Sequence, residues 1–298
     1  TRWFQGEEGD GDASKNLSLQ LAGLADVYVN DAFGSWQPHA STYTITHYLP
    51  SYAGFLMQQE VINLGRVLEP ERAFVAVVAG SKYDTKIKPL YAIYEKVDCL
   101  ILGGVIYNTF LCAKYKVRIQ GVTDEDVSLA RELVERDRVL RKIVELPFVI
   151  ESDTMEGRTE GKFRTISIRD FREGNSYGYI LDIDPSSFED RAVADAIGTA
   201  KTIFVNAVMG YTPYFTAGSQ ALDHTIDRNR DAMKMYGGGD TLQEFKDLCP
   251  GLYLSVMDNA HYYFFTGGGT VLTAIEQGSP YGLKPLQALM ESKKNAAS

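Results

Sequence analysis

Long apolar runs, clustered cysteines and an excess of basic residues are all missing from this sequence. No apolar run reaches the length of a membrane-spanning helix, so we expect no membrane insertion. The net charge of −9 leaves no basic stripe for a nucleic-acid backbone, which excludes a general nucleic-acid binder. The three cysteines and four histidines are scattered, without disulfide or metal-ligand spacing. No signal-peptide pattern follows Thr1, and we expect a soluble protein, either cytoplasmic or organellar (plastid or mitochondrial).

What the sequence does contain is enough apolar material for a large core, with 45% hydrophobic residues in 298. A helix is predicted at about 53–68, and Thr123 is a predicted helix N-cap. From residue 74 strands and helices alternate, with apolar strand candidates at 74–78, 100–104, 146–150, 179–183 and 202–206. This alternation predicts an α/β fold with a doubly wound, parallel-sheet (Rossmann-like) C-terminal lobe.

Two glycine triplets follow apolar runs. Gly237-Gly238-Gly239 precedes Asp240 and Thr241, and Gly267-Gly268-Gly269 repeats the arrangement. Free backbone N–H groups at such a helix start favour an anion, and Asp240 suits a magnesium ion carried by a nucleotide. A plain tight turn between strand and helix is the alternative. We expect ligands at the carboxyl edge of the sheet, which the sequence places at Gly80, Gly103, Asn206, Gly237 and Gly267.

The order of these turns resembles the phosphoglycerate kinase family over nearly the whole chain. Residues 25–34 look like the family's "DVYVNDAFG", and residues 50–57 look like its "PSVAGFLM". Residues 80–87 resemble "GGAKVSDKI" and 206–210 resemble "NGPMG". Residues 237–241 match "GGGDS/T", and 266–269 match "STGGG".

The resemblance implies phosphate transfer between ATP and 3-phosphoglycerate across two α/β lobes, with Mg-ATP or Mg-ADP as cofactor and no tightly bound metal. By position, the implied catalytic residues are Lys82, Lys86, Gly267, Gly268 and Gly269, which we expect to be vestigial. Asp240 would hold magnesium through the nucleotide. The implied nucleotide-binding residues are Gly80, Lys82, Lys86, Gly103, Gly104, Leu181, Asn206, Gly237, Gly238, Gly239, Asp240 and Thr241.

Departures from the family pattern affect both implied lobes. Gln37 and Pro38 stand in the family's "GTAHRAH" turn, which is one residue shorter here and lacks its arginine. No other side chain reproduces the planar fork of a guanidinium. Ala207 and Val208 replace the glycine and proline of "NGPMG". The residues after Gly210 lack the family's ribose-binding glutamate, and Asp184, in place of the glycine of "DIGP", would repel polyphosphate if it faces inward.

Four parts follow from the resemblance. They are a remnant of the phosphoglycerate-binding N-terminal lobe (1–52), an interlobe helix (53–70), a nucleotide-binding lobe (71–278) and a C-terminal tail (279–298). The first part would leave apolar faces exposed, so we expect a protein partner that covers residues 1–55. The leading hypothesis is a pseudoenzyme acting as a structural or accessory subunit, with residual Mg-nucleotide binding. The alternatives are an active phosphoglycerate kinase shown in part, and a non-catalytic nucleotide-dependent regulator.

Overall fold

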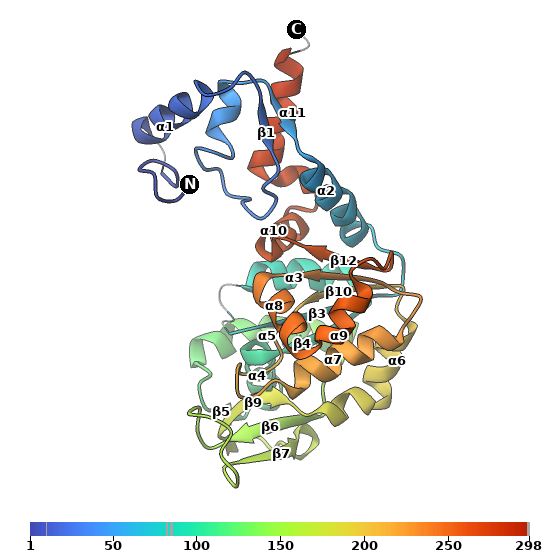
Figure 1. The fold of residues 1–298 in the computed structure, drawn as a ribbon. Coiled ribbons are helices and arrows are strands. Elements are labelled where there is room, and N and C mark those ends of the chain that lie inside the picture. Colours follow the sequence, from blue (N-terminus) through green and yellow to red (C-terminus); the bar gives the residue numbers. More distant parts are fainter. Residues whose placement is uncertain (10, 82, 84–85, 297–298) are drawn as a thin grey trace. The chain divides into compact units, whose positions relative to one another are not determined.

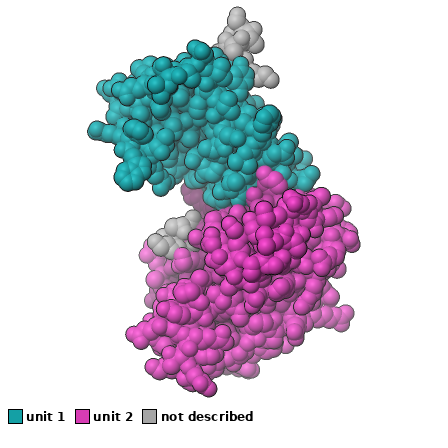
Figure 2. All heavy atoms as spheres, viewed as in Figure 1, with its two compact units in different colours: residues 1–69, 265–298 teal, residues 70–264 magenta. Residues whose placement is uncertain are grey.

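The computed structural model describes residues 1–9, 11–81, 83 and 86–296. By their contacts these residues form two units. Unit 1 is Thr1–Glu69 with Phe265–Ser298, and unit 2 is Pro70–Phe264 (Figure 2). The nucleotide-binding lobe expected from the sequence runs on to residue 278, whereas here residues 265–278 group with the N-terminal segment. Within the described residues, none of the helices combines the length and the apolar character that crossing a membrane requires.

Unit 1 is built from short elements at both ends of the chain. They are α1 (Asp12–Ala22), β1 (Tyr28–Asn30), η1 (Thr44–His47), β2 (Ser51–Ala53), α2 (Phe55–Leu68), α10 (Gly268–Gln277), η5 (Pro280–Gly282) and α11 (Lys284–Ala296) (Figure 1). Strands β1 and β2 pair in parallel, and α11 packs against β2. The Ser292 hydroxyl on α11 accepts a hydrogen bond from the Ser51 N–H at 3.0 Å, which joins the two segments of the chain.

Unit 2 carries the larger part of the fold (Figure 1). Its elements are β3 (Phe74–Gly80), α3 (Ile87–Lys96), β4 (Cys99–Gly103), α4 (Gly104–Tyr115), β5 (Arg118–Ile119), α5 (Asp124–Leu140), β6 (Phe148–Ser152), β7 (Phe163–Ser167), η3 (Ile168–Asp170), β8 (Ser176–Tyr177), β9 (Tyr179–Ile183), η4 (Pro185–Glu189), α6 (Arg191–Thr199), β10 (Thr202–Asn206), α7 (Ala217–Arg228), β11 (Met233–Gly237), α8 (Gly239–Leu248), α9 (Pro250–Val256) and β12 (Tyr262–Phe265).

The main sheet has the strand order β12-β11-β10-β3-β4. Strands β11, β10, β3 and β4 run parallel, and the whole of β10 is buried, as expected for a sheet covered on both faces. Helix α4 packs against β3 and β4, and α8 packs against β11. The fold class predicted from the alternating strands and helices is confirmed. The four parallel strands end at Gly80, Gly103, Asn206 and Gly237, which share one edge of the sheet.

Two of the strands predicted for this sheet lie elsewhere. The predicted strands at 146–150 and 179–183 correspond to β6 and β9, which pair antiparallel in a separate sheet of order β7-β6-β9. Their apolar composition reflects packing around Ile150, Leu181 and Phe215. An apolar run alone does not distinguish a buried parallel strand from an antiparallel strand over a second core.

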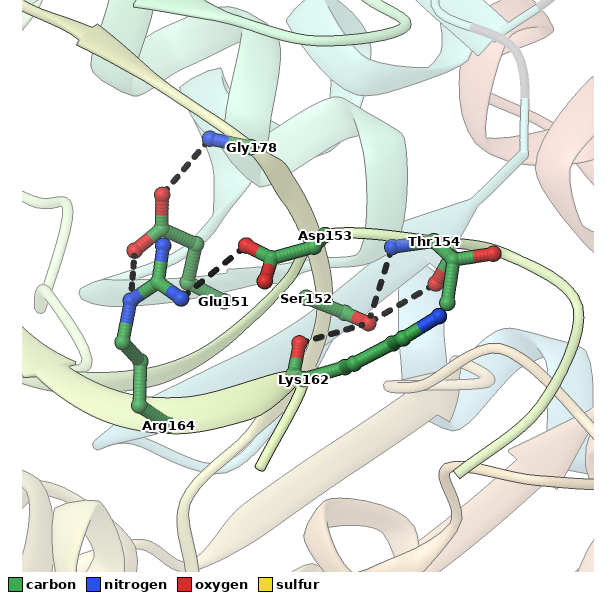
Figure 3. Close-up of polar contacts among 7 residues, drawn as sticks. All are labelled: Glu151, Ser152, Asp153, Thr154, Lys162, Arg164 and Gly178. Atoms are coloured by element: carbon green, nitrogen blue, oxygen red, sulfur yellow. Dashed lines mark hydrogen bonds and ion pairs between the residues drawn. The ribbon is translucent and has the colours of Figure 1, made fainter. Parts of the chain in front are cut away.

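Charged side chains link the strands of the three-stranded sheet at one end, where Glu151 of the central strand β6 contacts Arg164 of β7 (Figure 3). Glu151 is almost fully buried, and its two carboxylate oxygens accept hydrogen bonds from the Gly178 N–H at 2.6 Å and from Nε of Arg164 at 2.9 Å. Arg164 also donates to Asp153 at 3.0 Å, so the buried charge of Glu151 is compensated. Ser152 donates to the Thr154 carbonyl at 2.7 Å and closes the turn.

Candidate functional site

A cavity of about 780 Å³ opens in unit 2 beyond the ends of β3, β4, β10 and β11. Ligands bind at this edge in open parallel sheets, since the loops that follow the strands diverge there. Many residues that the sequence predicted for the site line the cavity, namely Gly80, Lys86, Gly104, Leu181, Asn206, Gly238, Gly239, Asp240 and Thr241. Gly103 and Gly237 end their strands just behind the lining. Lys82 lies outside the described residues.

The start of α8 provides an anion site within this cavity. Gly238 precedes the helix with φ of +125°, and no side chain caps the first N–H groups of α8. A Cβ on Gly238 would lie 2.7 Å from Nδ2 of Asn206, so both backbone geometry and space require glycine. Asn206 in turn donates to the Gly237 carbonyl. The uncapped N–H groups, with Asp240 exposed beside them, are suited to the phosphates of a magnesium-bound nucleotide.

Lys86 brings a positive charge to the same place. Its Nζ donates hydrogen bonds to the Ala79 carbonyl at 2.6 Å and to Oδ1 of Asn206 at 2.9 Å. Burial lowers the pKa of Lys86, and the nearby carboxylate of Asp240 acts in the opposite direction. The ammonium group is therefore held between the ends of β3 and β10, where it can attract a polyphosphate.

Close contacts within the protein require glycine at the ends of β3 and β4. Gly104 has φ of +58° and forms a parallel β-bridge with Gly80. A Cβ on Gly104 would lie 2.9 Å from the Gly80 carbonyl oxygen. A Cβ on Gly103 would lie 2.6 Å from the sulfur of Met209, which packs over this strand end. The sequence did not indicate Met209 as part of the site.

The sequence reasoning missed three further carboxylates that line the cavity, those of Asp182, Glu244 and Asp247. Asp182 accepts hydrogen bonds from the Gly218 and Ile183 N–H groups, while burial raises its pKa to about 6. Burial raises the pKa of Glu244, and hydrogen bonds from the hydroxyls of Ser219 and Thr212 oppose this rise. A signal for Glu244 existed, because it follows Asp240 by four residues on a helix and so shares its face.

The departures from the family pattern have different outcomes. Val208 lines the cavity, whereas Ala207 is buried and is not among the lining residues. Asp184 is not part of the lining, and the repulsion considered for it has no structural basis. Its carboxylate caps η4 through the Ser186 N–H and accepts a hydrogen bond from Thr165 at 2.6 Å.

The second glycine triplet belongs to unit 1, where it begins α10. A Cβ on Gly267 would lie 2.6 Å from the Cα of Gly34, and one on Gly269 would lie 3.2 Å from Nε1 of Trp36. Thr270 of α10 also donates a hydrogen bond to the Phe33 carbonyl at 2.9 Å. The turn from Phe33 to Trp36 therefore packs against the first turn of α10.

The described residues contain no group of three or more metal-ligating side chains. Asp240 is a lone carboxylate at the first turn of α8. Such a residue fits a magnesium ion that is held mainly by phosphate oxygens and water.

Comparison with known proteins identifies the family to which this chain belongs. The model of the family described as phosphoglycerate kinase matches residues 1–278. A phosphoglycerate kinase of Moorella thermoacetica is 36% identical over 233 residues, covering 76% of this chain and 57% of that protein. The enzyme of Trichodesmium erythraeum is 34% identical, covering 92% of this chain and 67% of that protein. The chain thus spans only about 57 to 67% of the length of these two relatives.

Solved structures agree with the sequence relatives. The phosphoglycerate kinase of Coxiella burnetii superposes with a TM-score of 0.78 at 29% identity, covering 98% of this chain and 71% of that one. The phosphoglycerate kinase of Pyrococcus horikoshii gives a TM-score of 0.75 with the same coverage. At 20% identity this second likeness concerns the fold alone.

Proposed function

We propose that this chain, which belongs to the phosphoglycerate kinase family, binds a magnesium-bound nucleotide in the cavity of unit 2 without transferring its phosphate. It would then act as a pseudoenzyme, as a structural or accessory subunit of a larger assembly. The observation that carries the binding is the uncapped start of α8, which faces a cavity of about 780 Å³ beside Lys86 and Asn206.

The charges around the cavity favour a nucleotide that arrives with its metal. Lys86 is the one cationic side chain among the described lining residues, whereas Asp182, Asp240, Glu244 and Asp247 are acidic. A bare polyphosphate would be repelled by these carboxylates, while a bound magnesium ion neutralises part of its charge and gives Asp240 a ligand. Binding should therefore depend strongly on Mg²⁺.

Three features support the absence of phosphate transfer. Phosphoryl transfer depends on positioned groups that neutralise charge at the transferred phosphate. The family resemblance implies that the triplet Gly267–Gly269 contacts the transferred phosphate. In this chain the indole of Trp36 packs beside Gly269. Gln37 and Pro38 supply no guanidinium, and Val208 brings an apolar side chain to the cavity wall.

An accessory role is supported by apolar side chains that unit 1 leaves exposed. Val29 and Tyr52 are paired across β1 and β2 and are 55% and 49% exposed. Phe55, two residues after the end of β2, is 84% exposed. Neighbouring exposed apolar residues of this kind mark interaction surfaces more often than isolated ones do. We propose that a protein partner covers them.

The test uses the complete natural protein. A coupled assay with ATP and 3-phosphoglycerate should show no turnover, and calorimetry should show binding of Mg-ATP. Asp240→Ala and Lys86→Ala should each weaken that binding at least tenfold, while the surface substitution Asp231→Asn should leave it unchanged. Robust phosphoglycerate-dependent ATP consumption would establish an active kinase instead. Binding without turnover that changes the affinity for a partner would favour a nucleotide-dependent regulator.

A further inference from the structure

Glu244 occupies a position on α8 that nucleotide phosphates do not explain. It lies one helical turn after Asp240, about 6 Å further along the axis, and faces the same cavity. Its side chain is 7% exposed, so it is a buried carboxylate in the cavity wall. Burying a charge costs free energy unless polar partners compensate for it, so its partners indicate what it can bind.

Two hydroxyl groups from another segment hold this carboxylate in place. Thr212 donates a hydrogen bond to Oε1 of Glu244 at 2.8 Å, and the hydroxyl of Ser219 also bonds to the carboxylate. Ser219 itself accepts a hydrogen bond from the Met209 N–H at 3.0 Å, which fixes its orientation. An ionised carboxylate accepts about four hydrogen bonds. Glu244 therefore keeps acceptor capacity toward the cavity after both hydroxyls are counted.

The chemistry of a ligand group at Glu244 is restricted by charge. Phosphate oxygens are acceptors and carry negative charge, so a carboxylate repels them. A neutral group with hydroxyl donors fits the remaining acceptor sites, and a vicinal diol can donate two hydrogen bonds at once. In a nucleotide whose phosphates lie at the start of α8, the ribose is the next group along the molecule.

We propose that Glu244 accepts hydrogen bonds from the 2′- and 3′-hydroxyls of a nucleotide ribose and makes the cavity selective for ribonucleotides. This inference rests on the proposed binding of nucleotide to unit 2. It assigns selectivity for the ribose to a side chain in the middle of α8. Thr212, in the loop before α7, fixes the orientation of that side chain through its hydrogen bond.

The test is calorimetry on the complete protein with Mg-ATP and Mg-2′,3′-dideoxy-ATP. Dideoxy-ATP lacks the two hydroxyls that would donate to the Glu244 carboxylate. The parent should therefore bind it at least about tenfold more weakly than ATP. Glu244→Gln should reduce this ratio to about threefold or less. Asp247→Asn is the matched control, because Asp247 also lines the cavity and lies on α8 but is exposed and bonded to Gln243. It should keep the ratio of the parent.

The outcomes separate this inference from the proposed function. Equal affinities of the parent for the two nucleotides would refute the role of Glu244 and leave nucleotide binding intact, and this needs no variant to fold. An unchanged ratio in Glu244→Gln would refute it as well. Failure of the parent to bind either nucleotide would overturn the proposed function and this inference together. Thr212→Val, which removes the anchoring hydroxyl, should lower the ratio without altering the carboxylate itself.

Discussion

A buried carboxylate on α7 should make unit 2 lose stability as the pH rises toward 8. Asp223 of α7 is 6% exposed and accepts a hydrogen bond from the hydroxyl of Tyr236 at 3.0 Å. Burial raises the pKa of Asp223 to about 8, and the charge of Glu244 adds to this, while the bond from Tyr236 opposes it. In the folded protein Asp223 therefore stays protonated at neutral pH.

The sign and size of the effect follow from proton linkage. The unfolded chain releases this proton near pH 3.9, whereas the folded chain keeps it up to about pH 8. The contribution of Asp223 to the free energy of unfolding is full below pH 3.9 and falls as the pH rises toward 8. The slope is about 1.4 kcal/mol per pH unit, so this group alone removes about 3 kcal/mol between pH 5 and pH 7.

The perturbation is Asp223→Asn, which has the shape of the protonated side chain and still accepts the bond from Tyr236. The variant should lack this part of the pH dependence and should be more stable than the parent at pH 7, by an amount that shrinks toward pH 4. Other titrating groups, such as Asp182, contribute equally to both proteins, and their effect cancels in the difference.

The assay is urea unfolding followed by far-UV circular dichroism at several pH values from 5 to 8. Tryptophan fluorescence would not report on unit 2, because both tryptophans, Trp3 and Trp36, belong to unit 1. Asp231→Asn is the control, since Asp231 is exposed near the start of β11. Stability profiles of the parent and Asp223→Asn that run parallel from pH 5 to pH 8 would refute the reasoning.

Three shorter predictions concern other parts of the chain. Gly238→Ala should destabilise the protein by about 1–3 kcal/mol in urea unfolding, because its φ is +125° and the new Cβ would meet Asn206. The control Gly239→Ala, where no atom lies within 4 Å, should be neutral or stabilise α8 by up to about 1 kcal/mol. Thr123→Ala should cost about 1 kcal/mol by removing the N-cap of α5, and an unchanged urea midpoint would contradict that role. Burial raises the pKa of the fully buried Glu60, so Glu60→Gln should stabilise unit 1 at neutral pH and lose that advantage below about pH 4, as measured by tryptophan fluorescence.

Much of the architecture could be predicted from local patterns. The apolar run at 74–78 is β3, the predicted helix at 53–68 is α2 from Phe55 to Leu68, and Thr123 caps α5 as expected. These elements depend on residues near one another in the chain, where side-chain period, capping and backbone sterics act directly. Errors arose where pairing decided the structure. The predicted strands at 146–150 and 179–183 became β6 and β9, which pair in a separate antiparallel sheet.

The sequence by itself determined that glycine-rich turns connect strands to the helices that follow them. From this pattern, Gly238 and Asp240 predicted a phosphate site. Torsional freedom at glycine and uncapped N–H groups are local properties, so they are visible without a fold. Only the tertiary structure decided that Glu244 meets Thr212 in that cavity, that Asp223 is buried against Tyr236, and that the second glycine triplet packs with Gly34 in unit 1. Burial and contact between distant segments set these features, because the environment of a carboxylate depends on what folds around it.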